Sequence, residues 1–306
     1  MFTHLLVPLD GSGLAEAALP AAAFIAERMG ARVTLLHVLE KNPPATAHGQ
    51  PHLQNAADAR AYLEDVAGRA FPPGVPVAIH IHEEAVGDVA KGIVAHAGEF
   101  DHDLIVLCSH GRGRALHLAL GSIAQKTASL GDIPTLLVHP GEAGEALPFV
   151  CDIILMPLDD DPEHDRVKPL AADMAKACGA ALRVVMVAPR YGNLSGRRAV
   201  TSRFLPGATS RLLDMAADAT VERLQAEIEA LRREGIDASG AVLRADPTQG
   251  ILAAAREWGA DLAVLATHGA LGVAALMEGS VAHKVCSLCG LPVLLVPAKA
   301  AGERSS

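Results

Sequence analysis

Aromatic residues are scarce in this sequence. They make up 3% of the 306 residues, with one tryptophan, two tyrosines and six phenylalanines. Half of the residues are hydrophobic and a fifth are charged, which is typical of a globular protein rather than a disordered chain. The core must therefore be built from Ala, Val, Leu and Ile, a composition that suits helices packed on a buried parallel sheet.

Long apolar runs are also missing. Runs such as 262–266 and 293–296 have the length of a strand, well short of the roughly 20 residues of a membrane helix. The opening residues MFTHLLVPLD carry no positive charge before the apolar run, so we expect a first strand there rather than a signal peptide. The sequence thus predicts a protein with no membrane partner.

Cysteine and positive charge are in short supply as well. Five cysteines without a disulfide-framework spacing favour a reducing compartment, so we expect the protein in the cytoplasm. The net charge of −9 argues against general nucleic-acid binding, which needs a basic face. A small anion held by backbone N–H groups remains compatible with an acidic chain.

Two patterns invite a metal or redox interpretation. Cys286 and Cys289 have C-x-x-C spacing, but we expect them to close the last helix before Pro292, where a redox motif is not normally found. There are fourteen histidines; His80 and His82 alternate along one predicted strand, and the others are dispersed in the sequence. We therefore predict no metal site and no metal-binding residues.

The sequence contains an internal repeat, and such a repeat determines how the fold is divided into domains. Residues 4–10 read HLLVPLD and 153–159 read IILMPLD, while 103–111 read DLIVLCSHG and 261–269 read DLAVLATHG. The first pair is offset by 149 residues and the second by 158, so the second copy holds about nine more, which we place in a loop at 188–210. We predict a first domain at 1–141, a linker at 142–150, a second domain at 151–300 and a tail at 301–306.

Within each copy, strand-length and helix-length segments alternate. The expected strands are 4–9, 32–38, 76–81, 103–107 and 135–138, then 152–158, 182–187, 239–244, 261–265 and 293–296. The expected helices are 13–29, 54–70, 87–98 and 121–130, then 163–178, 210–234, 247–258 and 279–288. Asp161-Pro162 and Asp246-Pro247 are helix-start signals. This alternation predicts an α/β fold with two tandem five-stranded parallel sheets, each Rossmann-like.

A ligand of such a sheet binds beyond the carboxyl ends of the strands. In the first copy, Asp10 follows the first strand, and Cys108 to Gly111 follow the fourth strand and lead to Gly121-Ser122 at a helix start. Backbone N–H groups there could hold a phosphate, with help from the basic side chains of the loop. A structural interpretation is equally open: Ser122 and Gln125 have capping-box spacing, and the Asp10 turn could simply cap the first helix.

Taken together, VPLDGS at 7–12, DLIVLCSHGRG at 103–113, GSIA at 121–124 and PTLLV at 134–138 resemble the universal stress protein family. The resemblance covers nearly the whole chain twice and implies a nucleotide-binding α/β fold in which many members bind ATP. The family signature is a glycine, two residues, a second glycine, nine residues and then Gly-Ser or Gly-Thr. Gly111 and Gly121-Ser122 match it, and so do Gly269 and Gly279-Ser280, but Cys108 and Ala266 replace the first glycine of each copy.

The resemblance implies ATP as the cofactor, with Mg²⁺ as a candidate companion ion. It places the first site at Pro8, Leu9, Asp10, Val38, Cys108, His110, Gly111, Arg112, Gly121, Ser122, Ile123 and Ala124. It places a weaker second site at Asp159, Val187, Ala266, Gly269, Gly279 and Ser280. We expect the nucleotide to prefer the first copy, because the second has acidic residues at 159–161 and Glu278, which would repel phosphate.

Three functions compete. The first is a cytoplasmic stress-response protein whose partners depend on bound ATP; the second is an interaction module without nucleotide. In that module the predicted strands 135–138 and 293–296 could pair within one chain as an intramolecular pseudo-dimer, with a homodimer as the other candidate. The third is an enzyme, at most a slow ATPase, because the sequence offers no convincing base, nucleophile or metal cluster. The protein partner is not identified by the sequence.

Overall fold

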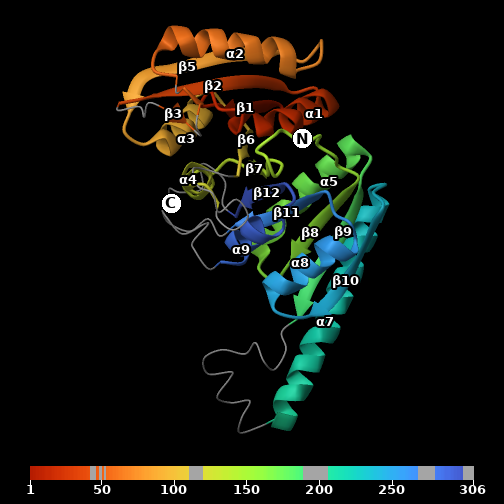
Figure 1. The fold of residues 1–306 in the computed structure, drawn as a ribbon. Helices are drawn as coiled ribbons and strands as arrows, with labels where there is room; N and C mark the ends of the chain where they lie inside the picture. Colours follow the sequence, from red (N-terminus) through yellow and green to blue (C-terminus); the bar gives the residue numbers. More distant parts are fainter. Residues whose placement is uncertain are drawn as a thin grey trace. The chain divides into compact units, whose positions relative to one another are not determined.

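A computed structural model describes residues 1–41, 46–47, 50–51, 53–109, 120–188, 206–267 and 280–298 (Figure 1). Contacts divide the chain into two compact units. The first unit is Met1–Val150 together with Leu265–Ser306, and the second unit is Cys151–Val264. The predicted division of the chain by its two repeats stays a prediction.

The first unit is built on a mostly parallel sheet. Its strands are β1 (His4–Pro8), β2 (Arg32–Glu40), β5 (Val77–Val86), β6 (Leu104–Cys108), β7 (Thr135–Val138) and β12 (Val293–Pro297). They lie in the order β5-β2-β1-β6-β7-β12. Chain order reverses between β1 and β6, so the carboxyl ends of these two strands form the switch point where open α/β sheets bind ligands.

Helices cover this sheet. They are η1 (Ala15–Ala18), α1 (Leu19–Met29), α2 (Ala56–Ala70), α3 (Val89–Glu99), α4 (Ser122–Leu130) and α9 (Val281–Leu288). Figure 1 shows α2 and α3 on opposite faces of the β2–β5 edge. The Asn55 side chain accepts a hydrogen bond from the N–H of Asp58 at 2.9 Å and so caps α2. A short hairpin of β3 (Thr46–Ala47) and β4 (Gln50–Pro51) was not predicted.

β7 and β12 pair antiparallel, with Val293 opposite Leu137 and Leu295 opposite Thr135. These are the two fifth strands of the repeats. The sequence raised their pairing within one chain as one alternative, and the register confirms it. All four side chains are buried, so each strand covers what would otherwise be an exposed apolar sheet edge.

The second unit has the parallel strand order β10-β9-β8-β11. The strands are β8 (Ile153–Leu158), β9 (Ala181–Ala188), β10 (Ala238–Arg244) and β11 (Leu262–Thr267), and the helices are η2 (Pro162–Arg166), α5 (Val167–Cys178), α7 (Pro206–Arg233) and α8 (Pro247–Glu257). The caps predicted at Asp161 and Asp246 are confirmed: they accept from the N–H groups of Glu163 and Gln249 at 3.0 and 3.2 Å. The loop expected at 188–210 is wrong at both ends, because Ala188 belongs to β9 and α7 begins at Pro206, and residues 189–205 lie outside the described structure.

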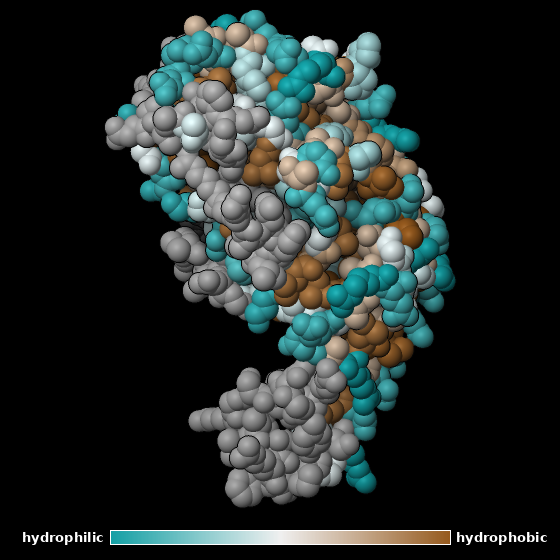
Figure 2. Space-filling model, in the orientation of Figure 1, coloured by the Kyte–Doolittle hydropathy of each residue, from teal (hydrophilic) through white to brown (hydrophobic). Residues whose placement is uncertain are grey.

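The cores confirm the aliphatic composition. The largest fully buried side chains are leucines and isoleucines such as Leu5, Leu36 and Ile154. On the face drawn in Figure 2, hydrophobic residues form separate patches among hydrophilic ones, and Leu212 and Met215 of α7 are among the exposed apolar side chains. In the described part of the chain, no helix combines the length and the hydropathy needed to cross a bilayer.

Candidate functional site

The chain leaving β1 is held against β2. Leu9 donates its N–H to the carbonyl of Leu36 at 2.8 Å, and the Nδ1–H of His37 donates to the carbonyl of Leu9, also at 2.8 Å. His37 is buried, and no sequence pattern indicated this role. The two bonds fix the backbone immediately before Asp10, the acidic residue that the sequence placed at this edge of the sheet.

Asp10, Gly11 and Ser12 form a tight turn. Asp10 Oδ1 accepts from the N–H and the hydroxyl of Ser12 at 2.9 and 2.6 Å, and Ser12 Oγ accepts from the N–H of Ala15 at 3.2 Å. Ser12 thus supports the turn that precedes η1, but the predicted capping of the first helix by this turn is wrong, because the N-caps of η1 and α1 are Leu14 and Ala18 and neither has a side-chain cap. The same contacts orient the Asp10 carboxylate at the end of β1.

Gly11 is required in this turn on two grounds. Its φ is +86°, in the left-handed region that side chains disfavour. A Cβ at Gly11 would also lie 2.8 Å from Cγ of Leu53. Leu53 therefore packs directly over the turn and leaves no room for a larger residue.

The end of β6 is tied to the start of α4. Ser109 donates its N–H to the carbonyl of Val138 at 2.8 Å and accepts the N–H of Gly121 at 2.7 Å. The hydroxyl of Ser109 shares a hydrogen bond of 2.8 Å with Nδ1 of His139. The chain segment that leaves at Ser109 thus returns at Gly121 to the same point. Ser109 and His139 were not among the predicted site residues.

The helix that follows begins without a side-chain cap. Gly121 has extended dihedrals, φ −60° and ψ 142°, and is the N-cap of α4, so Ser122 is the first helical residue. The capping box predicted for Ser122 and Gln125 is wrong, because the cap lies one residue earlier at a glycine. The first N–H groups of α4 have no partner within the helix and point toward the carboxyl edge of the sheet, an arrangement that attracts anions.

The predicted residues of the first site contribute in different ways. Pro8, Val38 and Cys108 lie in β1, β2 and β6, whose carboxyl ends meet at this edge. Leu9, Val38 and Ala124 are 3%, 6% and 4% exposed, so their side chains pack inside the unit and present little surface to a ligand. Asp10 and Cys108 are half-buried, and Ser122 and Ile123 are exposed. His110, Gly111 and Arg112 lie outside the described residues.

The residues predicted for the second site divide between the units. Asp159 and Val187 lie in the second unit, whereas Ala266 and Ser280 belong by their contacts to the first. Gly269 and Gly279 lie outside the described residues. Ser280 is the N-cap of α9, and its hydroxyl accepts from the N–H of His283 at 3.1 Å. Its matching residue, Ser122, lies inside α4 instead, so the two helix starts differ.

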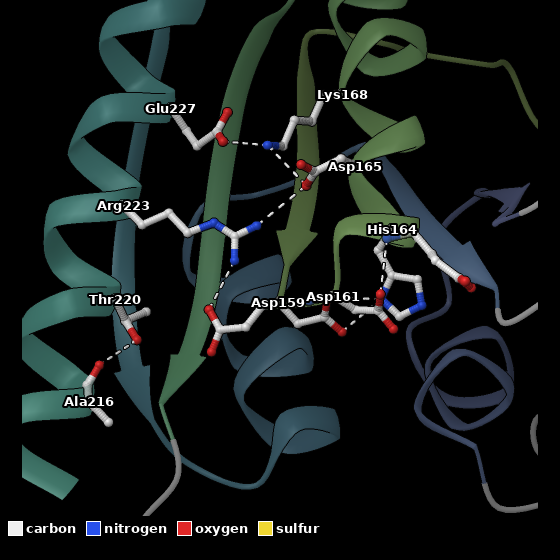
Figure 3. A network of polar contacts seen from close by, with 11 residues as sticks. Asp159, Asp161, His164, Asp165, Lys168, Ala216, Thr220, Arg223 and Glu227 are labelled. Carbon is white, nitrogen blue, oxygen red and sulfur yellow. Dashed lines mark hydrogen bonds and ion pairs between the residues drawn. The ribbon is translucent and has the colours of Figure 1, made fainter. Parts of the chain in front are cut away.

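Asp159, the repeat equivalent of Asp10, is paired with a histidine. Figure 3 shows His164 of η2 turned back onto the Asp159 carboxylate, with Nδ1 at 2.8 Å from both oxygens. The hydrogen bond to Asp159 raises the pKa of His164, against the effect of burial. This pair was not predicted, since nothing in the sequence distinguishes His164 from the other histidines.

Further charges hold α7 against η2 and the start of α5. Arg223 contacts Asp160 at 2.9 Å and Asp165 at 3.4 Å, and Lys168 bridges Asp165 and Glu227 (Figure 3). The Arg223 and Lys168 side chains are 28% and 20% exposed, so each pair is worth at most about 1 kcal/mol. Over the residues that the structure describes, no cluster of three or more His, Cys, Asp or Glu is arranged to hold a metal ion.

Comparison with known proteins agrees with the family resemblance seen in the sequence. The model of the universal stress protein family matches residues 1–139 and 151–297. The chain is 31% identical over 151 residues to the universal stress protein YxiE of Bacillus subtilis, with 45% of this chain and all of that protein aligned. It is 34% identical over 144 residues to a universal stress protein of Thermus aquaticus, again with 45% and 100% covered.

A solved structure of a universal stress protein from Archaeoglobus fulgidus has the same fold. It aligns with 97% of this chain and 98% of its own at a TM-score of 0.66 and 17% identity. The family model covers both repeats, which confirms the resemblance drawn from the VPLDGS and SHGRG segments. The chain belongs to the universal stress protein family, with two copies of the family domain in tandem.

Proposed function

We propose that the first repeat binds an adenine nucleotide, ATP, and that this stress-response protein acts in the cytoplasm on partners that depend on nucleotide occupancy. The observation that carries the proposal is the uncapped start of α4, held to the end of β6 by the bond from Gly121 to Ser109. It lies at the switch point of the sheet, next to the end of β1. Backbone N–H groups in this position suit a phosphate.

The residues around this point have complementary roles. The first-turn N–H groups of Ser122, Ile123 and Ala124 would hold phosphate oxygens, and the Ser122 hydroxyl would add a donor. Asp10 would accept hydrogen bonds from the adenine amino group or a ribose hydroxyl. Arg112, which lies outside the described residues, would neutralise phosphate charge. Mg²⁺ would come with the phosphates, as it commonly does in nucleotide sites.

The first repeat is favoured over the second. Asp10 accepts its two described hydrogen bonds from Ser12, a neutral residue. Its equivalent Asp159 is paired with His164, and the hydroxyl of Ser280 already caps α9. A nucleotide at the second repeat would have to displace these contacts, and it would meet the acidic residues 159–161.

Nucleotide binding is known for other proteins with this type of domain. A universal stress protein from Archaeoglobus fulgidus has been solved in complex with dAMP; it aligns with 48% of this chain at 20% identity and a TM-score of 0.32. In this chain, nucleotide binding is supported by the uncapped start of α4 and its bond to the end of β6. We assign no general base to the described residues at the helix start, so we expect any ATP hydrolysis to be slow.

The alternative is an interaction module without nucleotide. It is favoured by the β7–β12 pairing, which assembles the two fifth strands inside one chain, and by Cys108, whose side chain stands at the end of β6 where the family signature has glycine. In this case the domain would serve in protein assembly, and the partner would be another protein.

Calorimetric titration of the full chain with ATP and Mg²⁺ tests the proposal. We expect about one nucleotide per chain, and acid release should free adenine nucleotide from protein purified without added ligand. Arg112→Ala with Gly121→Val should weaken binding about tenfold to a hundredfold, the effect of losing one or two charge-assisted contacts. The matched control, Gly279→Val in the second repeat, should bind as the wild type does, and circular dichroism checks that each variant folds. Unchanged affinity in the double variant would refute the placement, and no binding heat would favour the alternative.

A further inference from the structure

Four histidines that are far apart in the sequence gather inside the first unit. His4 begins β1, His80 lies in β5, His96 lies in α3 and His102 precedes β6. Their ring centroids are 3.8 Å apart for His4–His102, 5.4 Å for His102–His96 and 4.3 Å for His96–His80. These residues are dispersed along the sequence, as noted above, but the fold brings the four together, and we call them the histidine cluster.

Three members of the cluster, His4, His96 and His102, are buried and have few hydrogen-bond acceptors. His4, His96 and His102 are 8%, 2% and 4% exposed. Nε2 of His4 lies 2.9 Å from Oγ1 of Thr34. Within the described structure, Nδ1 of His4, Nδ1 of His96 and both ring nitrogens of His102 are buried without a hydrogen-bond partner. A protonated imidazole donates from both nitrogens, so protonation would bury N–H donors that lack a well-placed acceptor.

The groups that face the cluster disfavour a positive charge. Burial is the largest cause that lowers the pKa of His96 and His102 to about 4, and it also lowers the pKa of His4. The positive charge of Arg32 in β2 also lowers the pKa of His4 and His102. The neighbouring histidines, including His82 of β5, lower the pKa of His96.

Opposing groups are present but weaker. The Asp103 carboxylate and the backbone carbonyls of 97, 100 and 101 raise the pKa of the nearby rings. Asp103 is occupied elsewhere: its oxygens accept from the N–H and hydroxyl of Thr3 at 2.7 and 2.6 Å and from the N–H of His4 at 2.9 Å. The ring of Phe100, with its centroid 4.4 Å from that of His96, adds apolar surroundings.

We propose that the histidine cluster is a proton-uptake site that opens the first unit in mildly acidic solution. The folded unit favours the neutral rings of His4, His96 and His102, and the unfolded or opened chain lets them take up protons. Acid therefore shifts the equilibrium toward the open form. The cluster begins at the amino end of β1, whereas the candidate nucleotide site follows the carboxyl end of that strand, so the device does not depend on ATP binding.

The sign and size follow from linkage. A ring with a folded pKa of about 4 and an unfolded pKa of 6.5 contributes stability above pH 6.5 and loses it as the pH falls toward 4. Between about pH 7.5 and pH 5.5 each such ring lowers the folding equilibrium constant roughly tenfold. His96 and His102 together then account for a change on the order of a hundredfold.

Hydrogen exchange of the full chain, read by mass spectrometry and corrected for the intrinsic pH dependence, tests the proposal. Between about pH 7.5 and pH 5.5, peptides from β1, α3 and β6 should lose protection in the wild type. His96→Phe and His102→Phe each keep a buried ring that cannot titrate. Each variant should make the pH-dependent loss of protection about tenfold smaller than in the wild type. His164→Gln is the control variant, because it changes a histidine of the second unit and should leave the loss of protection in the first unit unchanged.

A second measurement works without any variant. The ring Cε1–H signals of the wild-type protein, followed by NMR against pH, should include two histidines that do not titrate above about pH 5. All histidines titrating near the ordinary value would overturn the proposal, and so would first-unit peptides whose protection stays constant down to about pH 5.5.

Discussion

Gly11→Ala should destabilise the first unit by two separable effects. The residue has a φ of +86°, and forcing a side chain into left-handed backbone costs about 1–2 kcal/mol. The added Cβ would also lie 2.8 Å and 2.9 Å from Cγ and Cδ1 of Leu53, and overpacking of this kind costs about 1–3 kcal/mol. We expect a total loss of about 2–5 kcal/mol in the free energy of unfolding, a large part of a typical domain's stability.

Two further variants separate these effects. Gly30 also has a positive φ, +65°, but no atom lies within 4 Å of the position of its Cβ, so Gly30→Ala measures the backbone cost alone. Leu53→Ala in combination with Gly11→Ala removes the clash. The assay is urea unfolding followed by circular dichroism, with a double-mutant cycle over Gly11 and Leu53.

We expect the double variant to be more stable than the sum of the single changes by about 1–3 kcal/mol. Strict additivity, together with equal losses for Gly11→Ala and Gly30→Ala, would refute the argument that Leu53 closes over the turn. The Gly11→Ala change also moves the Asp10 carboxylate, so ATP affinity should fall in parallel if the first repeat is the nucleotide site.

Three other outcomes are expected. Asn55→Ala removes the cap of α2 and should lower the free energy of unfolding by about 1 kcal/mol, whereas Asn55→Ser, which keeps an acceptor, should lose much less. The pKa of His164 is raised by Asp159, so its contribution to stability is present below pH 6.5 and is lost as the pH rises through the pKa of the folded state. His164→Gln should abolish that stabilisation of the second unit, as measured by urea unfolding at several pH values. Bound ATP should slow the alkylation of half-buried Cys108 but not that of half-buried Cys178 in the second unit, and equal rates with and without ATP, measured by peptide mass spectrometry, would contradict the position of the site.

Local patterns explain what could be predicted of the site. The Asp10 turn, the end of β6 and the glycine before α4 were found from the sequence, because glycine, aspartate and serine mark turns and helix starts wherever they occur. The position of the cap could not be found in this way. Ser122 and Ser280 occupy matching places in the two repeats, yet the cap is Gly121 in one case and Ser280 in the other, since the dihedrals at a helix start depend on how the preceding chain is held.

The sequence by itself determined the repeat, the order of strands and helices and the aliphatic core. These follow from the period of apolar residues and from turn chemistry, both of which act over a few neighbouring residues. Only the tertiary structure decided that β7 pairs with β12, that His164 forms a hydrogen bond with Asp159 and that His4, His96 and His102 share one buried cluster. The β7–β12 pairing and the histidine cluster join residues through the packing of separate elements, which no local spacing in the chain encodes. Asp159 and His164 are close in the chain, but their contact depends on how the chain turns between β8 and η2.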